Sequence, residues 1–236
     1  LNGDNDKLVT VREPDYKLVF FGIENPNVDF RAKDIEEKNG FTSFTVEFYG
    51  ASQRVTVPTV GIHNVYDALA AFAVGYEMRM EPQKIAAGLK SFVPSGMRQR
   101  IKKVGGITVI EDCYNASPDS QKAALDVLSS FKSNRRIAVL GDMLELGKYS
   151  DISHENVGKY TENKNIDILF TYGAKAKHIA EGAKGFVDEI KSFDDKTELV
   201  KALLETLKDG DAVLFKASRG MKLEDVINSL YREWEE

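Results

Sequence analysis

The sequence has 236 residues, of which 42% are hydrophobic and 29% charged, and this is the composition of a globular protein of one or two domains. Its net charge of -5 and pI of about 5.4 argue against nucleic acid or an anionic membrane as the main partner, because both require clustered Lys and Arg. The single cysteine excludes an internal disulfide and fits a cytoplasmic location, although a bacterial periplasmic protein could share this feature.

No membrane-spanning helix is expected, because Glu77 and Arg79 interrupt the longest apolar-rich stretch.

The first part of the chain, residues 1–93, is expected to be β-rich and then helical. Three segments are typical of strands: KLVFFG at 17–22, FTSFTVEF at 41–48 and RVTV at 54–57. An apolar helix is predicted over 65–78 and a second helix over 82–92, where Pro82 suits the first turn.

The second part, residues 94–236, alternates short β-branched runs with helical stretches. Strands are predicted at 107–112, 136–142, 166–173 and 212–218, and helices at 117–131, 152–163, 174–183, 194–210 and 221–234. In the helix over 194–210, Asp194 or Asp195 suits the cap and Gly210 the stop. This alternation predicts parallel βαβ units, so the fold class is α/β: a Rossmann-like C-terminal domain with a mostly parallel sheet, preceded by the β-rich and helical piece.

Polar residues gather where the predicted parallel strands end. They are Asp112 to Asn115, Gly141 and Asp142, Tyr172 and Gly173, and Lys216, Ser218 and Arg219. Ligands bind at this edge of a parallel sheet, because loops diverge there and helix N-termini present free N–H groups. Ser117 is expected to cap the helix that Pro118 begins. The alternative is that such loops are polar in any α/β protein.

Other motifs exclude several kinds of site. GDMLELGKY differs from a phosphate loop, because its glycines are one residue too far apart and Tyr149 stands where Ser or Thr would bind magnesium. Gly105-Gly106 precedes a strand, which favours a hairpin turn over a dinucleotide motif. Cys113 and the three histidines lack metal-ligand spacing, so no metal site is expected.

Five stretches, taken together and in this order, resemble the Mur ligase family: GIHNVYDALAAFAVG, PSGMRQR, IEDCYNASPDSQKAAL, AVLGDMLELG followed by SHENVG, and LFKASRGMKLEDVI. The resemblance is greatest to the ligases that add D-alanyl-D-alanine to UDP-N-acetylmuramoyl-tripeptide. LNGDND is similar to a segment late in the family's central ATPase domain. The resemblance therefore implies that residues 1–93 end that domain and residues 94–236 form the C-terminal domain. The chain begins at Leu1 without Met, and we expect it to be part of a longer protein.

The family's activity would make the protein an ATP-dependent amide ligase of peptidoglycan synthesis. ATP would phosphorylate the carboxylate of the UDP-linked tripeptide, and the amine of D-alanyl-D-alanine would attack the acyl phosphate. The phosphate loop and the main Mg²⁺ ligands are expected outside this chain, so the chain alone should be inactive. The full-length protein is expected to be a monomer, and the isolated chain to associate through exposed strand edges. Alternatives are a relative such as folylpolyglutamate synthase or cyanophycin synthetase, or a non-catalytic nucleotide-binding α/β domain.

The resemblance also implies roles for individual residues. The expected nucleotide contacts are His63, Asn64, Asp67, Arg98, Asp112, Tyr114 and Asn115. The expected substrate contacts are Asp142, Lys216, Ser218 and Arg219, with Arg98 and Lys216 also catalytic. Asp67 stands where the family usually has Asn. A carboxylate oxygen, which accepts hydrogen bonds, therefore replaces the amide NH₂ with its two N–H donors. His63 has the alternative reading of a helix-start histidine packed beside Tyr66, and Glu145 and His154 match family positions without an assigned role.

Overall fold

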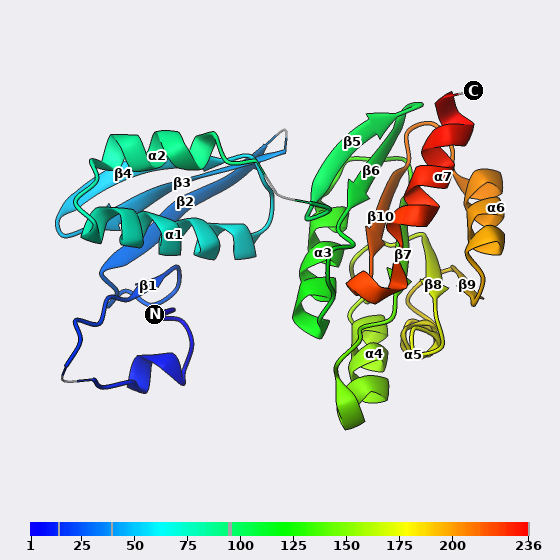
Figure 1. Ribbon diagram of the computed structural model, residues 1–236, viewed down its shortest axis with the longest axis horizontal. Helices are drawn as coiled ribbons and strands as arrows, with labels where there is room; N and C mark the ends of the chain where they lie inside the picture. Colours follow the sequence, from blue (N-terminus) through cyan, green and yellow to red (C-terminus); the bar gives the residue numbers. More distant parts are fainter. Residues whose placement is uncertain (14, 39, 94–95, 236) are drawn as a thin grey trace. The chain divides into compact units, whose positions relative to one another are not determined.

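The computed structural model describes residues 1–13, 15–38, 40–93 and 96–235 (Figure 1). The chain divides into two compact units, Leu1–Val93 and Pro94–Glu236. Each unit has a sheet, helices and a hydrophobic core of its own.

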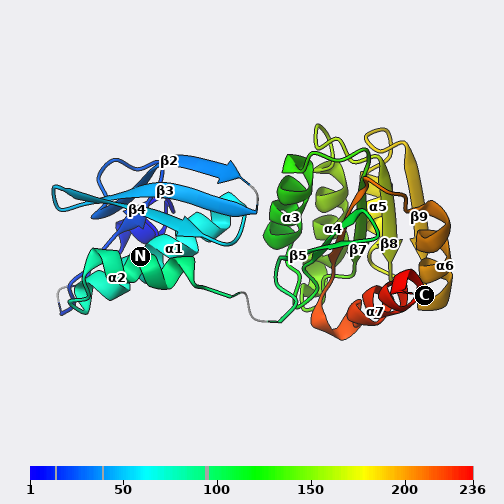
Figure 2. The same cartoon turned by 90° about the horizontal axis from the view of Figure 1, so that it is seen from above.

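The first unit is a four-stranded sheet with two helices on one face (Figure 2). Its elements are η1 (Leu8–Thr10), β1 (Phe21–Gly22), β2 (Phe30–Lys38), β3 (Phe41–Phe48), β4 (Ala51–Val57), α1 (Ile62–Glu77) and α2 (Pro82–Lys90). The strands lie in the order β1-β2-β3-β4, with β1 parallel to β2 and the other pairs antiparallel. Alternate strand residues pack against the helices, among them Phe30, Phe44 and Val55 against Leu69 and Phe72.

Most predictions for this unit are confirmed, and two strands differ. Residues 41–48 and 54–57 lie in β3 and β4, both helices form, and Pro82 is the first residue of α2. Of the expected strand at 17–22, only Phe21 and Gly22 pair as β1. Strand β2 was not predicted, because six of its nine residues are charged and only Phe30 and Ala32 are buried.

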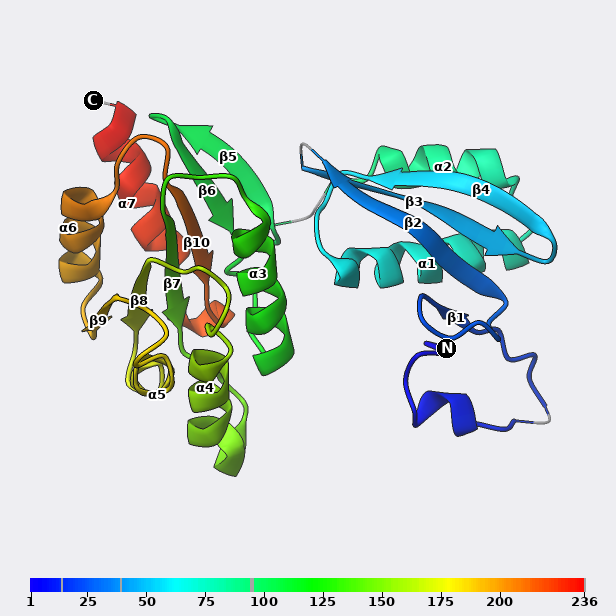
Figure 3. The ribbon, with the colours of Figure 1, turned by 180° about the vertical axis from the view of Figure 1, so that it is seen from behind.

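The second unit is a six-stranded sheet in the order β5-β6-β10-β7-β8-β9 (Figure 3). Its strands are β5 (Arg100–Val104), β6 (Ile107–Glu111), β7 (Arg136–Gly141), β8 (Ile168–Tyr172), β9 (Glu189–Phe193) and β10 (Ala212–Lys216). Only the edge strand β5 is antiparallel to its neighbour. Parallel strands with both faces covered give a continuous apolar core, and all five residues of β10 are buried.

Helices cover both faces of this sheet (Figure 2). They are α3 (Pro118–Ser130), α4 (Ser150–Lys159), α5 (Lys177–Gly182), α6 (Lys196–Thr206) and α7 (Glu224–Glu235), with short 3-10 turns η2 (Gly147–Tyr149) and η3 (Arg219–Met221). α6 and α7 lie on one face, where Leu203 and Ile227 pack against Val139, Phe170 and Phe215. α3, α4 and α5 lie on the other face.

The βαβ alternation predicted from the sequence is confirmed, and so are most of its boundaries. Gly105 and Gly106, with φ of 53° and 75°, make the hairpin turn between β5 and β6. Ser117 caps α3 through a hydrogen bond from the Ser120 N–H, and Asp195 caps α6. The predicted stop at Gly210 is wrong. α6 ends at Thr206, because the next residue is extended, and Gly210 instead turns the chain into β10 with φ of 85°.

Strand β9 was also absent from the sequence predictions. Its residues, EIKSF, include three polar side chains, and none of the five is fully buried. β9 is an edge strand and pairs only with β8, so its outer side does not need the apolar pattern by which buried strands are recognised.

Helices α4 and α5 contact each other through their backbones. A Cβ atom on Gly158 would clash with the carbonyl oxygen of Ile179, and one on Gly182 would clash with that of Glu155. Backbone atoms cannot swing aside as a flexible side chain can, so the two helices must separate to admit even a methyl group.

We therefore expect Gly158→Ala to destabilise the second unit by about 1–3 kcal/mol, although alanine favours a helix more than glycine does. The measurement is urea unfolding followed by circular dichroism. Gly88→Ala in α2 is the matched control, since no atom lies within 4 Å of the added Cβ and a gain of about 0.5–1 kcal/mol is expected. Equal effects of the two substitutions would contradict the close helix contact.

Candidate functional site

The polar residues singled out in the sequence lie together at one edge of the six-stranded sheet. Strands β6, β10, β7 and β8 are parallel neighbours, so their carboxyl ends meet at the lower edge in Figure 1. Asp112 follows β6, Asp142 follows β7, and Lys216 ends β10 with Ser218 and Arg219 directly after it. The predicted grouping of these residues at the sheet edge is confirmed.

Lys216 is the most enclosed charge in this group, with 2% of its surface exposed. Its Nζ lies 2.9 Å from Asp112 Oδ2 and donates to the carbonyl oxygens of Asn115, at 3.0 Å, and Asp112, at 3.4 Å. An ammonium has three N–H donors. All three donors therefore point to oxygens of the loop that follows β6.

Ser218 joins the loops that follow β6 and β7. Its Oγ accepts a hydrogen bond from the Leu144 N–H at 2.9 Å and donates to the Ala116 carbonyl oxygen at 3.4 Å. Its own N–H donates to the Asp142 carbonyl oxygen at 3.1 Å. The Ser218 hydroxyl is thus already hydrogen-bonded on both sides within the protein.

Asp142 is buried and accepts two backbone hydrogen bonds through one oxygen. Its Oδ1 lies 3.0 Å from the Lys175 nitrogen and 2.6 Å from the Ala176 nitrogen, at the start of α5. Gly173, with φ of 112°, brings the backbone so close that an added Cβ would lie 2.5 Å from the same carboxylate. Asp142 therefore fixes the loop between β8 and α5.

Two arginines lie close to the ring of Tyr114. Tyr114 is 42% exposed, with the Arg98 Cζ 4.2 Å from its ring centroid and the Arg219 Cζ 5.9 Å away. Arg219 also pairs with Glu224 at 3.1 Å. In the described parts of the chain, no carboxylate lies within ion-pair distance of Arg98, so its guanidinium keeps donors for an anionic ligand. A cation–π contact at an exposed site contributes about 0.5–1 kcal/mol, enough to bias the position of Arg98.

Cys113 lies in the loop that follows β6, and its side chain is fully buried, with the Sγ 3.6 Å from the Met97 Sδ. Burial, assisted by the negative charges of Glu224, Glu111 and Asp112, raises the pKa of the Cys113 thiol to about 12. The thiolate is the nucleophilic form of cysteine. Cys113 is therefore protonated at neutral pH, which argues against a thiol enzyme.

His154 on α4 holds the loop that follows β7. Its Nε2 accepts a hydrogen bond from the Met143 N–H at 2.9 Å, so the proton is assigned to Nδ1, which donates to the Ser150 carbonyl oxygen at 2.7 Å. Burial lowers the pKa of His154, and the hydrogen bond to Ser150 opposes this only in part. The neutral ring of His154 therefore has a structural role, which the sequence did not indicate: it holds the Met143 backbone.

Because the pKa of His154 is lower in the folded state, the unfolded chain binds more protons just below pH 6.5. The second unit should therefore lose stability as the pH falls from about 7.5 to about 5.5, with this residue contributing at most about 1.4 kcal/mol per pH unit. His154→Gln should weaken this pH dependence, and His178→Gln on a partly exposed ring is the control. Urea unfolding at each pH measures the effect; an unchanged dependence in His154→Gln would contradict it.

The remaining predicted residues lie on the first unit, in the first two turns of α1. Gly61, with φ of 105°, precedes the helix, and His63 and Asn64 are half-buried just after it. The Asn64 Nδ2 donates to the Val60 carbonyl oxygen at 2.8 Å and lies 3.0 Å from the His63 Nε2. Asp67 is exposed. Both the nucleotide role of His63 and the alternative of a helix-start histidine are compatible with this position.

Asp4 is a further organising residue of this unit that the sequence did not reveal. Its carboxylate accepts hydrogen bonds from the Ile23, Glu24 and Asn25 N–H groups and from the Tyr66 hydroxyl. Burial alone would raise the pKa of Asp4, but these hydrogen bonds bring it below its usual value. Asp4 therefore ties the start of the chain to α1.

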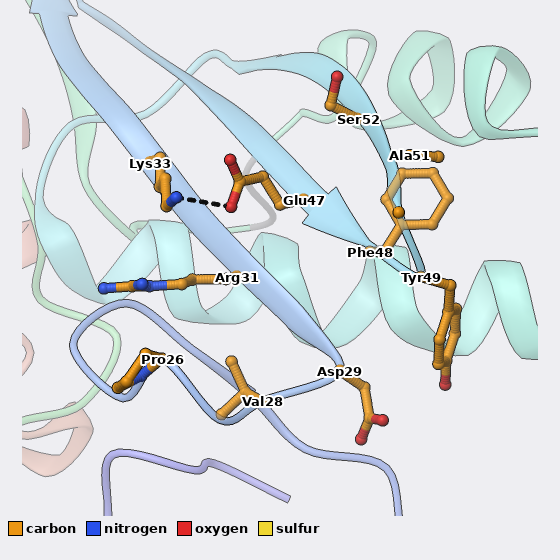
Figure 4. Close-up of a pocket in the computed structure, with 11 residues that line it drawn as sticks. Pro26, Val28, Asp29, Arg31, Lys33, Glu47, Phe48, Tyr49, Ala51 and Ser52 are labelled. Carbon is orange, nitrogen blue, oxygen red and sulfur yellow. Dashed lines mark ion pairs between the residues drawn. The ribbon is translucent and has the colours of Figure 1, made fainter.

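A shallow groove of about 560 Å³ lies elsewhere on the first unit, between residues 26–33 and 47–52 (Figure 4). Its charges are largely compensated: Lys33 pairs with Glu47 at 2.8 Å, and Arg31 donates to the Ile23 and Glu24 carbonyl oxygens. None of the predicted site residues lines this groove.

Within the described residues, no three His, Cys, Asp or Glu side chains are grouped so that they could hold a metal ion. None of the described helices of this chain is both long and apolar enough to span a bilayer.

Sequence comparisons give the family. The profile of the "Mur ligase, glutamate ligase domain" matches residues 97–219, about half of the chain, and that of the "Mur ligase middle domain" matches residues 1–75. The chain belongs to the Mur ligase family.

Two curated Mur ligases named UDP-N-acetylmuramoyl-tripeptide--D-alanyl-D-alanine ligase are similar to it. The one from Bacillus subtilis is 39% identical over 86% of this chain and 45% of its own length, and the one from Escherichia coli is 33% identical over 91% and 47%.

Solved Mur ligase structures are similar as well. MurF from Acinetobacter baumannii has a TM-score of 0.82 and 26% identity, covering 92% of this chain and 47% of that one. MurF ligase from Thermotoga maritima in complex with ADP has a TM-score of 0.78 and 26% identity, covering 92% and 49%. The mixed α/β fold with a mostly parallel sheet, predicted from the sequence, is thereby confirmed as a Mur ligase fold. The chain spans about half the length of the Mur ligases it matches.

Proposed function

We propose that this chain is part of an ATP-dependent ligase that joins D-alanyl-D-alanine to UDP-N-acetylmuramoyl-tripeptide in peptidoglycan synthesis. Residues 1–93 would be the C-terminal part of the middle domain and residues 94–236 the C-terminal domain. The observation that carries the proposal is the sheet edge that brings together Asp112, the exposed Tyr114 and two arginines near its ring, Arg98 and Arg219. The 39% identity to a curated ligase of this name supports it.

The proposed chemistry needs cationic groups at this edge of the sheet. The tripeptide carboxylate takes the γ-phosphoryl group of ATP, which releases ADP and gives an acyl phosphate, and the dipeptide amine then displaces phosphate to form the amide. Cationic donors are required for the phosphates of the nucleotide and for the peptide carboxylates, because this chain has a net charge of -5 and gives no general attraction to anions. Arg98 and Arg219 provide such donors locally.

On the second unit we assign nucleotide contacts to Asp112, Tyr114, Asn115 and Arg98. On the first unit, taken by itself, we propose His63, Asn64 and Asp67 as nucleotide contacts. A short carboxylate such as Asp112 suits the vicinal hydroxyls of ribose, and the related Thermotoga structure is described as a complex with ADP. Arg219 is assigned to the peptide substrates, and Ser218 and Asp142 are proposed to hold the neighbouring loops of the substrate site. We propose that the main Mg²⁺ ligands lie in other parts of the full-length protein.

Location and assembly belong to the same proposal. The substrates are cytoplasmic precursors of the cell wall, so we propose a cytoplasmic enzyme that is monomeric at full length. The isolated chain would self-associate through strand edges such as β4, whose outer side has no strand partner within the sheet. Analytical ultracentrifugation of both forms tests this statement.

Arg98→Ala in the full-length gene product should lower kcat by about a hundredfold while changing the KM for D-alanyl-D-alanine little, because a group that neutralises charge developing on the transferred phosphoryl acts in the transition state. Steady-state kinetics with varied dipeptide measure both constants. Arg232→Ala, on an exposed position of α7, is the control. Normal turnover in Arg98→Ala would remove Arg98 from the reaction.

The chain of residues 1–236 alone should neither release phosphate from ATP nor form the pentapeptide product at a rate comparable to a complete ligase. Its sequence contains no GxxGK[ST] loop, whose lysine and backbone N–H groups cradle the nucleotide phosphates in related enzymes. The assay combines the purified chain with ATP, Mg²⁺, UDP-N-acetylmuramoyl-tripeptide and D-alanyl-D-alanine, with the Bacillus subtilis relative as reference. A comparable rate would place the phosphate-binding chemistry on this chain.

A further inference from the structure

The environment of Lys216 differs from that of the other cations at the sheet edge. Arg98 is exposed, and the side chain of Arg219 is 61% exposed. Lys216, in contrast, is buried, and each of its three N–H donors is directed to an oxygen of Asp112 or Asn115. A ligand oxygen could reach the Lys216 ammonium only by displacing one of these bonds and entering a closed site.

The position of Lys216 in the sheet explains why it reaches this loop. β10 lies between β6 and β7, and Lys216 is aligned with Leu140 on β7 while its side chain bonds to the chain that leaves β6. The Asp112 N–H also donates to the carbonyl oxygen of Phe215, at 2.9 Å. Hydrogen bonds with Phe215 and Lys216 of β10 therefore hold both the N–H and the carbonyl oxygen of Asp112.

The charge of Lys216 also changes what Asp112 can bind. The side chain of Asp112 is 19% exposed, and its Oδ1 accepts a long hydrogen bond, 3.3 Å, from the Gln99 N–H. Without a partner, this carboxylate would repel the phosphates of a nearby nucleotide. The adjacent ammonium cancels that charge, while the oxygens of Asp112 remain acceptors for hydroxyl donors.

We propose that Lys216 is a positioning residue: it holds the Asp112 to Asn115 loop in the form that binds the nucleotide ribose, and it contacts neither the nucleotide nor the peptide substrates. This inference rests on the proposed ligase function and deepens it, since it assigns the buried lysine of the sheet edge to the nucleotide half of the site.

A double-mutant cycle in the full-length gene product tests the inference. Lys216→Met should raise the apparent KM for ATP about tenfold or more and leave the KM for D-alanyl-D-alanine within about twofold. Asp112→Asn should raise the KM for ATP similarly, and adding Lys216→Met to it should have little further effect, because the lysine acts through the aspartate. Lys201→Met, an exposed lysine of α6, is the matched control and should behave as the wild type.

A main effect of Lys216→Met on the dipeptide KM would overturn the positioning role, and so would equal effects on the ATP KM with and without Asp112→Asn. A lower kcat with both KM values unchanged would also overturn it, because a smaller folded fraction has that signature. If Lys216→Met does not fold, Lys216→Gln decides by the same criteria, since its amide still offers two donors.

A second readout does not depend on activity. Hydrogen exchange at the backbone N–H groups of Asp112 to Ala116 should be faster in Lys216→Met than in the wild type and unchanged in Lys201→Met. Unchanged exchange would overturn the positioning role even in an active ligase. A wild-type protein that ligates nothing in the presence of ATP, but shows the expected exchange, would instead refute the proposed function alone.

Discussion

The ion pair between Lys216 and Asp112 is the contact on which the arrangement of the site depends. Lys216 is the last residue of β10, and Ser218 lies two residues beyond it in the chain that leaves the strand. One binds the loop after β6, and the other joins that loop to the loop after β7. The end of the central strand β10 therefore sets the spacing between two loops that belong to different βαβ units.

Near this buried pair, some charged side chains are hydrogen-bonded within the protein, whereas others remain free to bind a ligand. Lys216 and Asp142 are used within the protein, whereas Arg98 rests on the ring of Tyr114 and, within the described residues, forms no ion pair. Such a division suits a reaction in which negative charge moves during catalysis, because the fixed pair maintains the geometry while the exposed guanidinium responds to the ligand.

The sequence predicted which residues meet at the sheet edge, because the rule that ligands bind at the carboxyl ends of parallel strands needs only the βαβ alternation. It did not predict what each side chain bonds to. The partners of Lys216 lie more than a hundred residues earlier, and those of Asp142 more than thirty residues later, so their contacts depend on strand order. Strands β2 and β9 were missed for a related reason, since their polar residues lack the periodicity of a buried strand.

The backbone contact between Gly158 and Gly182 also limits where the length of this chain can change. Each added residue turns an α-helix by about 100°, so a single insertion early in α4 would rotate Gly158 away from α5 and bring a larger side chain to the contact. A compensating insertion in α5 would not restore the match, because that helix starts at the loop that Asp142 holds. Insertions in this half of the unit are therefore confined to the connections, such as residues 160–167 and 183–188, where no helix register has to be kept.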